Sequence, residues 1–290
     1  MMMRMVCGFW MAMMVVPVIQ AQEIVLTYRP YSDQDVRYRY PEELLRLVIA
    51  RTEEKYGAAI VVQSDFSFSR DRTKLEIEKG QYLHVIAEAP KPGWEEDLLP
   101  IRIPIRKGIQ GYRLFLIHKD NADALKQVRT LEELKTFSTG SGAQWSTQAV
   151  MEQAGFDVVV GASYEGLFQM LEIGRFVTFG RGVNEIFDEY DAQKDMFPDL
   201  RIEETLALYI PLPTYFFVTP TRPELAHRIE EGLLAMITDG SFDTFFLQYH
   251  QQMIDKAQLS QRRIFRLPNP NLSNETPLMN SQFWYFPSQS

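Results

Sequence analysis

A glycine-rich turn in the middle of the chain holds residue types suited to binding a small anion. Residues 140–145 read Gly-Ser-Gly-Ala-Gln-Trp, and an amphipathic run follows them as far as Gly155. This order predicts a tight turn that opens a helix. The first turn of a helix offers unpaired backbone N–H groups and the positive end of the helix dipole, which favour a carboxylate. An ordinary loop is the alternative. The ligand-binding candidates in this turn are Ser141, Gly142, Gln144 and Trp145.

Two arginines lie in residues 99–108, where apolar and cationic residues alternate. Arg102 and Arg106 are four residues apart, so in an extended chain both side chains point the same way. Each guanidinium can bind a carboxylate through two parallel hydrogen bonds, which predicts an anion site. The alternative is a solvated face, since Pro100 and Pro104 argue against a central strand.

Three further residues complete the set of binding candidates. Arg181 and Glu185 lie in the turn after a short strand predicted at 175–179, and Arg181 favours an anionic ligand. Glu185 is either a ligand contact or a solvated helix acid. Tyr28 ends the first predicted strand just before Pro30, where the chain must turn.

The first 21 residues predict a cleaved secretory signal peptide. Arg4 is their only charge, an apolar run covers 6–19, and Ala21 provides a small residue for cleavage. An uncleaved anchor is the alternative, but the run is short for a bilayer span. We therefore expect a periplasmic protein. Cys7 is the sole cysteine and lies in this segment, so the mature chain has no thiol and no cysteine-based metal site.

Composition excludes several classes of function. Of 290 residues, 46% are hydrophobic and 23% charged, which is typical of a globular protein. Without Arg4, 29 cations face 38 acids, and this net charge of −9 argues against binding to nucleic acid or anionic lipid. The four histidines have no metal-ligand spacing, and no nucleophile elbow or phosphate loop occurs. We expect no metal, no cofactor and no catalytic residues.

Strand and helix patterns alternate along most of the chain. Strands are predicted at 23–27, 59–62 and 82–87 with helices between them, an order typical of a mostly parallel sheet with helices on both faces. The same alternation returns between 112 and 179. A late helix has aromatic residues at helical spacing, which predicts core packing. These residues are Phe242, Phe245, Phe246 and Tyr249.

Several short motifs, taken together, resemble those of bacterial periplasmic solute-binding proteins of extracellular family 3, which bind polar amino acids. The resemblance spans residues 23–260, and its motifs occur in the family's order. They are Glu132–Lys135, Gly140–Gly142, Leu171–Arg175, Tyr215–Thr219 followed by Arg222–Leu225, and Ile237–Phe242.

This resemblance implies a type II periplasmic-binding fold, with two α/β lobes joined by two crossover strands at 112–118 and 215–219. Residues 22–112 and 213–264 would form lobe 1, and 113–212 would form lobe 2. The tail, 265–290, would pack on lobe 1 or stay mobile.

The resemblance also implies a function. A first-lobe arginine, Arg102 or Arg106, and N–H groups of the 141–144 turn would hold the carboxylate of a small polar solute between closing lobes. The family's acid after Gly-Arg is absent here, and Arg181 follows instead, which favours a carboxylate-bearing solute over an ordinary amino acid. The protein would be a monomer that serves an inner-membrane ABC permease or a sensor.

Two alternatives use the same scaffold. Some relatives of this family are dehydratases, and Glu88 at the end of the third strand would be the general acid. A ligand-sensing module without a transporter is the other alternative.

Overall fold

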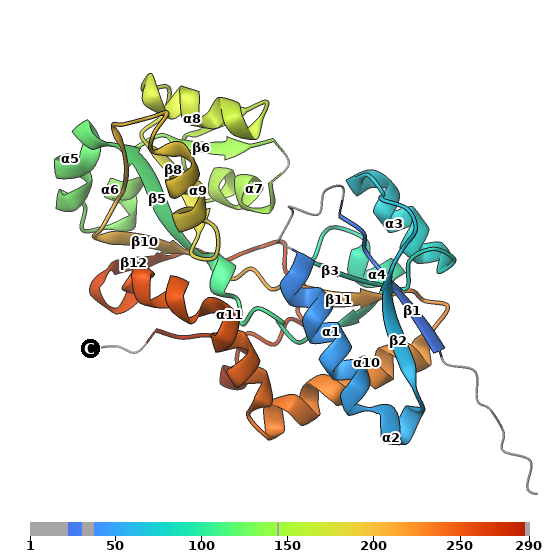
Figure 1. Cartoon of the computed structure of the whole chain (residues 1–290). Coiled ribbons are helices and arrows are strands. Elements are labelled where there is room, and N and C mark those ends of the chain that lie inside the picture. The colour runs from blue at the N-terminus through green and yellow to red at the C-terminus, as the bar shows by residue number, and fades with distance from the viewer. Residues whose placement is uncertain (1–22, 31–37, 144, 288–290) are drawn as a thin grey trace, which may run out of the picture.

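The computed structural model describes residues 23–30, 38–143 and 145–287. The predicted signal peptide, residues 1–21, and Gln144 lie outside these ranges. Within the described residues, no helix combines the length and apolar composition needed to cross a bilayer. The chain forms two lobes with a long helix running between them (Figure 1).

Lobe 1 is a sheet of strand order β2-β1-β3-β11-β4 with helices on both faces. The first three strands are parallel, and β11 enters antiparallel between β3 and β4 because it returns from the other lobe. Its elements are β1 (Glu23–Thr27), α1 (Arg39–Arg51), α2 (Glu53–Tyr56), β2 (Ala59–Gln63), α3 (Arg70–Lys79), β3 (Val85–Glu88), α4 (Trp94–Asp97), β4 (Leu99–Ile101), β11 (Tyr215–Val218) and α10 (Pro223–Thr238).

Lobe 2 has the strand order β12-β10-β5-β8-β6-β7, with β9 paired to β5. The strands β6, β7 and β8 are parallel, and β5 is antiparallel to its neighbours. Its elements are β5 (Tyr112–His118), α5 (Ala122–Gln127), α6 (Leu131–Lys135), β6 (Thr139–Gly142), α7 (Ser146–Gln153), β7 (Val158–Gly161), α8 (Tyr164–Glu172), β8 (Thr178–Gly182), α9 (Ile186–Gln193), β9 (Leu200–Ile202), β10 (Leu206–Tyr209) and β12 (Arg263–Arg266).

The two-lobed α/β architecture is therefore confirmed, with mixed rather than mostly parallel sheets. The expected crossover strands β5 and β11 lie inside the sheets, and residues 102–111 and 210–214 run between the lobes. Ile210 N donates to Gly111 O at 3.0 Å, and a Cβ atom at Gly111 would come within 2.2 Å of the carbonyl oxygen of Ile210. The two connections therefore touch, and glycine is required where they do.

Helix α11 (Ser241–Ala257) joins the two lobes through its packing. Phe242 and Phe245 are buried in the lobe 1 core, and Phe246 and Ile254 in the core of lobe 2. The prediction that these phenylalanines are core residues is confirmed. After α11 the chain forms β12 at the edge of the lobe 2 sheet, so this strand extends lobe 2 although it follows the helices of lobe 1.

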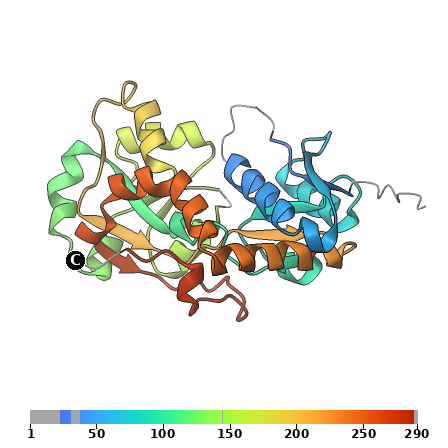
Figure 2. The same cartoon turned by 60° about the horizontal axis from the view of Figure 1, so that its bottom comes forward.

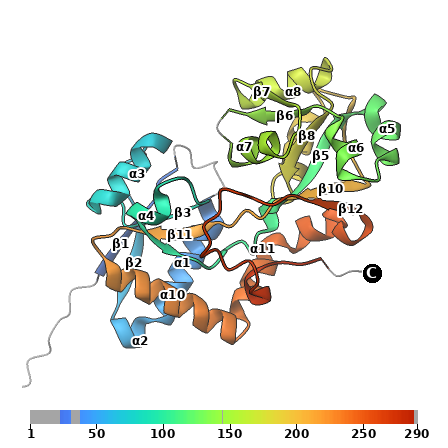
Figure 3. The same ribbon diagram turned by 180° about the vertical axis from the view of Figure 1, so that it is seen from behind.

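The C-terminal tail contacts both lobes and the connection between them (Figures 2 and 3). Asn269 Nδ2 donates to Pro211 O at 2.9 Å, and Glu275 pairs at 2.6 Å with Arg102, the first residue after β4 of lobe 1. Tyr285 N then donates to Lys107 O at 2.8 Å. The tail thus crosses the segment where the lobes are joined, rather than packing on lobe 1 alone.

Candidate functional site

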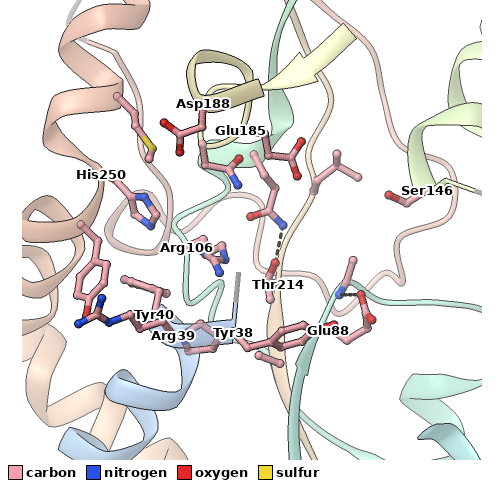
Figure 4. A pocket seen from close by; sticks show the side chains of 18 of the residues that line it. Tyr38, Arg39, Tyr40, Glu88, Arg106, Ser146, Glu185, Asp188, Thr214 and His250 are labelled. Carbon is pink, nitrogen blue, oxygen red and sulfur yellow. Dashed lines mark hydrogen bonds between the residues drawn. The ribbon is translucent and has the colours of Figure 1, made fainter. Parts of the chain in front are cut away.

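A cavity of about 460 Å³ lies between the lobes, where the two connections and α11 meet (Figure 4). Its volume falls in the range of small-molecule sites. Lobe 1, both connections, lobe 2 and α11 all contribute to its wall. The lining residues are Tyr38, Arg39, Tyr40, Pro41, Ala87, Glu88, Ala89, Arg106, Gln110, Arg113, Ser146, Asn184, Glu185, Asp188, Leu212, Thr214, Tyr249, His250 and Met253.

Three helices begin at this cavity. Helix α1 begins at Arg39, α7 begins at Ser146, and α9 begins just after Glu185, and all three of these residues line the wall. The positive ends of helix dipoles and the unpaired N–H groups of first turns favour a bound anion. The backbone therefore contributes positive potential from both lobes.

Arg106 supplies a formal positive charge in the middle of the cavity (Figure 4). Its guanidinium lies 4.8 Å from the centre of the Tyr40 ring, and Tyr40 is held in turn by a 2.6 Å hydrogen bond from its hydroxyl to Ile105 O. Burial lowers the pKa of Arg106, while Tyr40 and Glu185 oppose that change. An arginine stays protonated in proteins, so the cavity keeps this charge.

A buried ionic cluster forms the lobe 2 side of the cavity. The Glu185 carboxylate lies 3.1 Å from Arg181 and 4.0 Å from Arg113, and it accepts a hydrogen bond from Gly182 N at 3.4 Å. Burial would raise the pKa of Glu185, but Arg181, Arg113 and Arg106 outweigh burial and hold it below its usual range. Glu185 is therefore ionised and already paired within the protein.

Arg113 is fixed in place beside Glu185. It donates to Gly180 O at 2.8 Å and to Gln110 O at 3.2 Å. Burial lowers the pKa of Arg113 to about 10, and Glu185 opposes that change. Sequence analysis missed this residue, although a lone cation in an otherwise apolar strand is a signal that it must have a buried partner.

His250 extends from α11 into the wall of the cavity near Arg106 (Figure 4). It is 4% exposed and packs 4.9 Å from the rings of both Tyr40 and Phe246. Burial, followed by the charge of Arg106, lowers the pKa of His250 to about 3. Its ring is therefore neutral at physiological pH.

We expect this buried histidine to make the fold less stable in acid. The unfolded chain binds a proton at His250 near pH 6.5, whereas the folded chain binds it only near pH 3. Between these pH values the unfolded state binds more protons than the folded state. Lowering the pH from 8 to 5 therefore decreases the free energy of unfolding by about 2 kcal/mol. His250→Phe should remove this part of the pH dependence in urea unfolding. His227→Phe, at an exposed site, should retain it. An unchanged pH profile in His250→Phe would contradict the prediction.

Arg102 lies outside the cavity lining. Its guanidinium pairs with Glu95 at 2.9 Å and with Glu275 of the tail at 2.6 Å, and Ser273 Oγ donates to the same Glu95 oxygen at 2.9 Å. Arg102 and Arg106 do not share a face, because residues 102–111 turn as they leave lobe 1 rather than running as a strand. Of the two arginines, Arg106 is the one that faces the cavity.

Arg181 also lies outside the cavity lining, directly behind it. Its guanidinium makes two 2.6 Å hydrogen bonds to Glu189 and stacks 4.5 Å from the Trp145 ring. The side chain is 9% exposed. Arg181 thus positions Glu185 and Trp145, and its own charge is met by carboxylates of the protein.

The glycine-rich stretch is a buried strand rather than an open turn. Ser141 and Gly142 belong to β6, and Ser141 Oγ donates to Gly142 O at 3.3 Å. Trp145 precedes α7, and Ser146 is the residue of this region that reaches the cavity. Helix α7 begins in the predicted region, but the glycine and serine residues before it belong to strand β6 of the lobe 2 sheet.

Two other candidates sit beside the cavity. Tyr28 stacks on Tyr38 at 4.5 Å, and Tyr38 lines the wall. Glu88 is in the lining and pairs with Lys91 at 3.2 Å. Tyr249, predicted as a core residue, packs at the edge of the lobe 1 core against Tyr40 and also lines the cavity.

One set of side chains in the described residues could hold a metal ion. His118, Glu172 and Asp199 place ligand atoms within 4.8 Å of one another in lobe 2, away from the cavity lining. Lys119 lies 2.8 Å from Asp199 and already supplies a positive charge there. His118 Nδ1 accepts a hydrogen bond from Asp120 N at 3.3 Å, and its Nε2 lies 3.7 Å from Asp199.

No protein-family model matches this chain, and no curated protein sequence matches it either. Solved structures do. The probable amino-acid ABC transporter extracellular-binding protein YtmK of Bacillus subtilis is 12% identical, with a TM-score of 0.56 over 79% of this chain and 97% of its own. YckB of Bacillus subtilis is 18% identical, with a TM-score of 0.52 over 84% and 96%.

A third structure, an ancestral arginine-binding protein bound to arginine, is 16% identical, with a TM-score of 0.51 over 79% of this chain and 97% of its own. At such low sequence identity, structural similarity shows a shared fold. The alignments cover nearly the whole of each compared protein. The chain therefore has the two-lobed α/β fold of solved solute-binding proteins, with its cavity at the junction of the lobes.

Proposed function

We propose that this chain is a divergent member of the extracellular family 3 solute-binding proteins. In this proposal it binds a small carboxylate-bearing solute in the interlobe cavity, in the periplasm after signal-peptide cleavage, and delivers it to an ABC permease or a sensor. The compared structures support solute binding, since one is an arginine-binding protein bound to arginine and another is a probable extracellular-binding protein of an amino-acid ABC transporter. Lobe closure over the ligand would follow from the two connections acting as a hinge.

The observation that carries this proposal is the position of Arg106. It lies in a cavity formed by both lobes, beside the starts of α1, α7 and α9. A guanidinium and three helix starts favour a ligand with a negative charge. Glu185, which also lines the cavity, lies 3.1 Å from Arg181 and 4.0 Å from Arg113.

Binding is favoured over catalysis. The dehydratase alternative needs a general acid, and Glu88 does line the cavity. Its carboxylate, however, pairs with Lys91 at 3.2 Å and accepts a hydrogen bond from Ala89 N at 3.1 Å. Product formation from a cyclohexadienyl substrate would favour the enzyme, and saturable binding without product would favour the proposal.

A thermal-shift panel tests the proposal. The purified protein is mixed with amino acids, dicarboxylates, sugar acids and neutral sugars, and hits are measured by calorimetry. A ligand at 100 times its Kd stabilises the folded state by about 2.7 kcal/mol, so a true hit raises the melting temperature. We expect at least one carboxylate to bind and its neutral amide analogue to fail. Hits confined to uncharged compounds would overturn the proposal.

A further inference from the structure

We propose that the cavity selects a carboxylic acid that carries several hydroxyl groups, recognised by Gln110, Asn184 and His250. This inference rests on the proposed function, because it takes the carboxylate to lie at Arg106. The inference goes beyond that function by naming the residues that bind the part of the ligand other than its carboxylate. The three residues come from three parts of the chain, namely the first connection, the turn before α9, and α11.

All three carry buried polar atoms without a hydrogen-bond partner among the described residues. These atoms are Gln110 Oε1, Asn184 Oδ1 and both ring nitrogens of His250. All three side chains line the same cavity. Burying a polar atom unpaired costs free energy, so native proteins pair nearly all of them. Three such groups around one cavity point to partners that a ligand brings.

The chemistry of these atoms specifies the ligand groups. Gln110 Nε2 donates to Thr214 Oγ1, which leaves the Gln110 oxygen as an acceptor. Asn184 Oδ1 is a second acceptor. A ligand that satisfies both must donate two hydrogen bonds, which an aliphatic chain or a second carboxylate cannot do.

His250 favours hydroxyl groups over charged groups. Its neutral ring has one donor nitrogen and one acceptor nitrogen. A hydroxyl group both donates and accepts, whereas an ammonium group only donates and an ionised carboxylate only accepts. An ammonium group beside His250 would also face the positive charge of Arg106. The geometry therefore favours a hydroxylated chain running from Arg106 towards α11.

The charges of the cavity agree with a ligand that is a single anion. Arg39, Arg106 and Arg113 line it together with Glu88, Glu185 and Asp188. The lining thus holds equal numbers of cations and acids, so it has little surplus positive charge for a second ligand carboxylate. A ligand with one carboxylate and neutral hydroxyl groups therefore fits better than a dicarboxylate.

Matched acids test this inference on the purified protein. D-gluconate, D-galactonate and hexanoate are six-carbon monocarboxylates that differ in their hydroxyl groups. We expect at least one sugar acid to bind at least about 10-fold more tightly than hexanoate by calorimetry. If hexanoate binds equally well, or amino acids bind and neither sugar acid does, the inference is overturned while the proposed function stands. If no carboxylate binds, the proposed function fails as well.

Variants test the residues. His250→Phe keeps the ring volume and removes both nitrogens, and Asn184→Leu removes the second acceptor. Each should weaken sugar-acid binding about 10-fold and leave hexanoate unchanged, since each loses one hydrogen bond. His227→Phe is the matched control and should bind as the parent does. The ligand-free melting temperature of His250→Phe should not fall, whereas a purely structural histidine would make it fall. If His250→Phe does not fold, the affinities of Asn184→Leu and of the matched acids test whether the cavity recognises hydroxyl groups.

Discussion

Replacing Arg106 with methionine is expected to weaken carboxylate binding by about 30- to 3,000-fold. The substitution keeps an apolar stem against Tyr40 and removes the charge that the cavity presents to the ligand. Truncating one partner of a buried, hydrogen-bonded charge pair costs about 2–5 kcal/mol, and each 1.4 kcal/mol is tenfold in affinity. Calorimetry with the best acid from the panel measures the loss, and a neutral analogue of that acid should be affected far less.

Arg102→Met is the matched control for this prediction. Arg102 lies outside the cavity in ion pairs with Glu95 and Glu275, so its loss should leave affinity within a few-fold of the parent. The comparison also decides which of the two sequence-predicted arginines contacts the ligand. Equal losses in both variants, or a loss in Arg102→Met alone, would refute the assignment of the carboxylate to Arg106.

Replacing Arg181 with methionine should mainly destabilise the fold, by about 3–5 kcal/mol. Arg181 is buried between Glu185 and Glu189 and makes two 2.6 Å hydrogen bonds to Glu189. Removing one partner from a buried ion pair leaves an uncompensated charge, which costs about this much. The stacking contact with Trp145 is lost too. Urea unfolding measures the change in the free energy of unfolding.

Arg175→Met serves as the control for Arg181→Met, because Arg175 is exposed in the turn before β8. It should leave stability within about 0.5 kcal/mol of the parent, as surface substitutions generally do. We expect double replacement, Arg181→Met with Glu189→Leu, to recover part of the loss, since it removes a buried carboxylate together with its partner. A stable Arg181→Met protein that no longer binds acids would instead make Arg181 a ligand contact.

Local sequence patterns predicted the alternation of strands and helices, and the resemblance of several motifs to a known family supplied the two-lobed arrangement. The capping box at Thr130–Glu133 and the phenylalanine stripe after Ser241 are properties of a few neighbouring residues. Hydrophobic spacing and turn residues act over the same short range. The strands β9, β10 and β12 were not predicted, because they are short and are stabilised by pairing with segments distant in the chain.

The sequence by itself determined the two-lobed α/β fold and the presence of arginines suited to an anion. Only the tertiary structure decided which of those arginines reaches the cavity. Arg102 and Arg181 lie outside the cavity lining in pairs with carboxylates of the protein. Arg106, Arg113 and His250 line the cavity and are brought together from a connection, a strand and a distant helix. A pattern of residue types predicts what a side chain can bind, but the partner it meets depends on long-range packing, which no local pattern encodes.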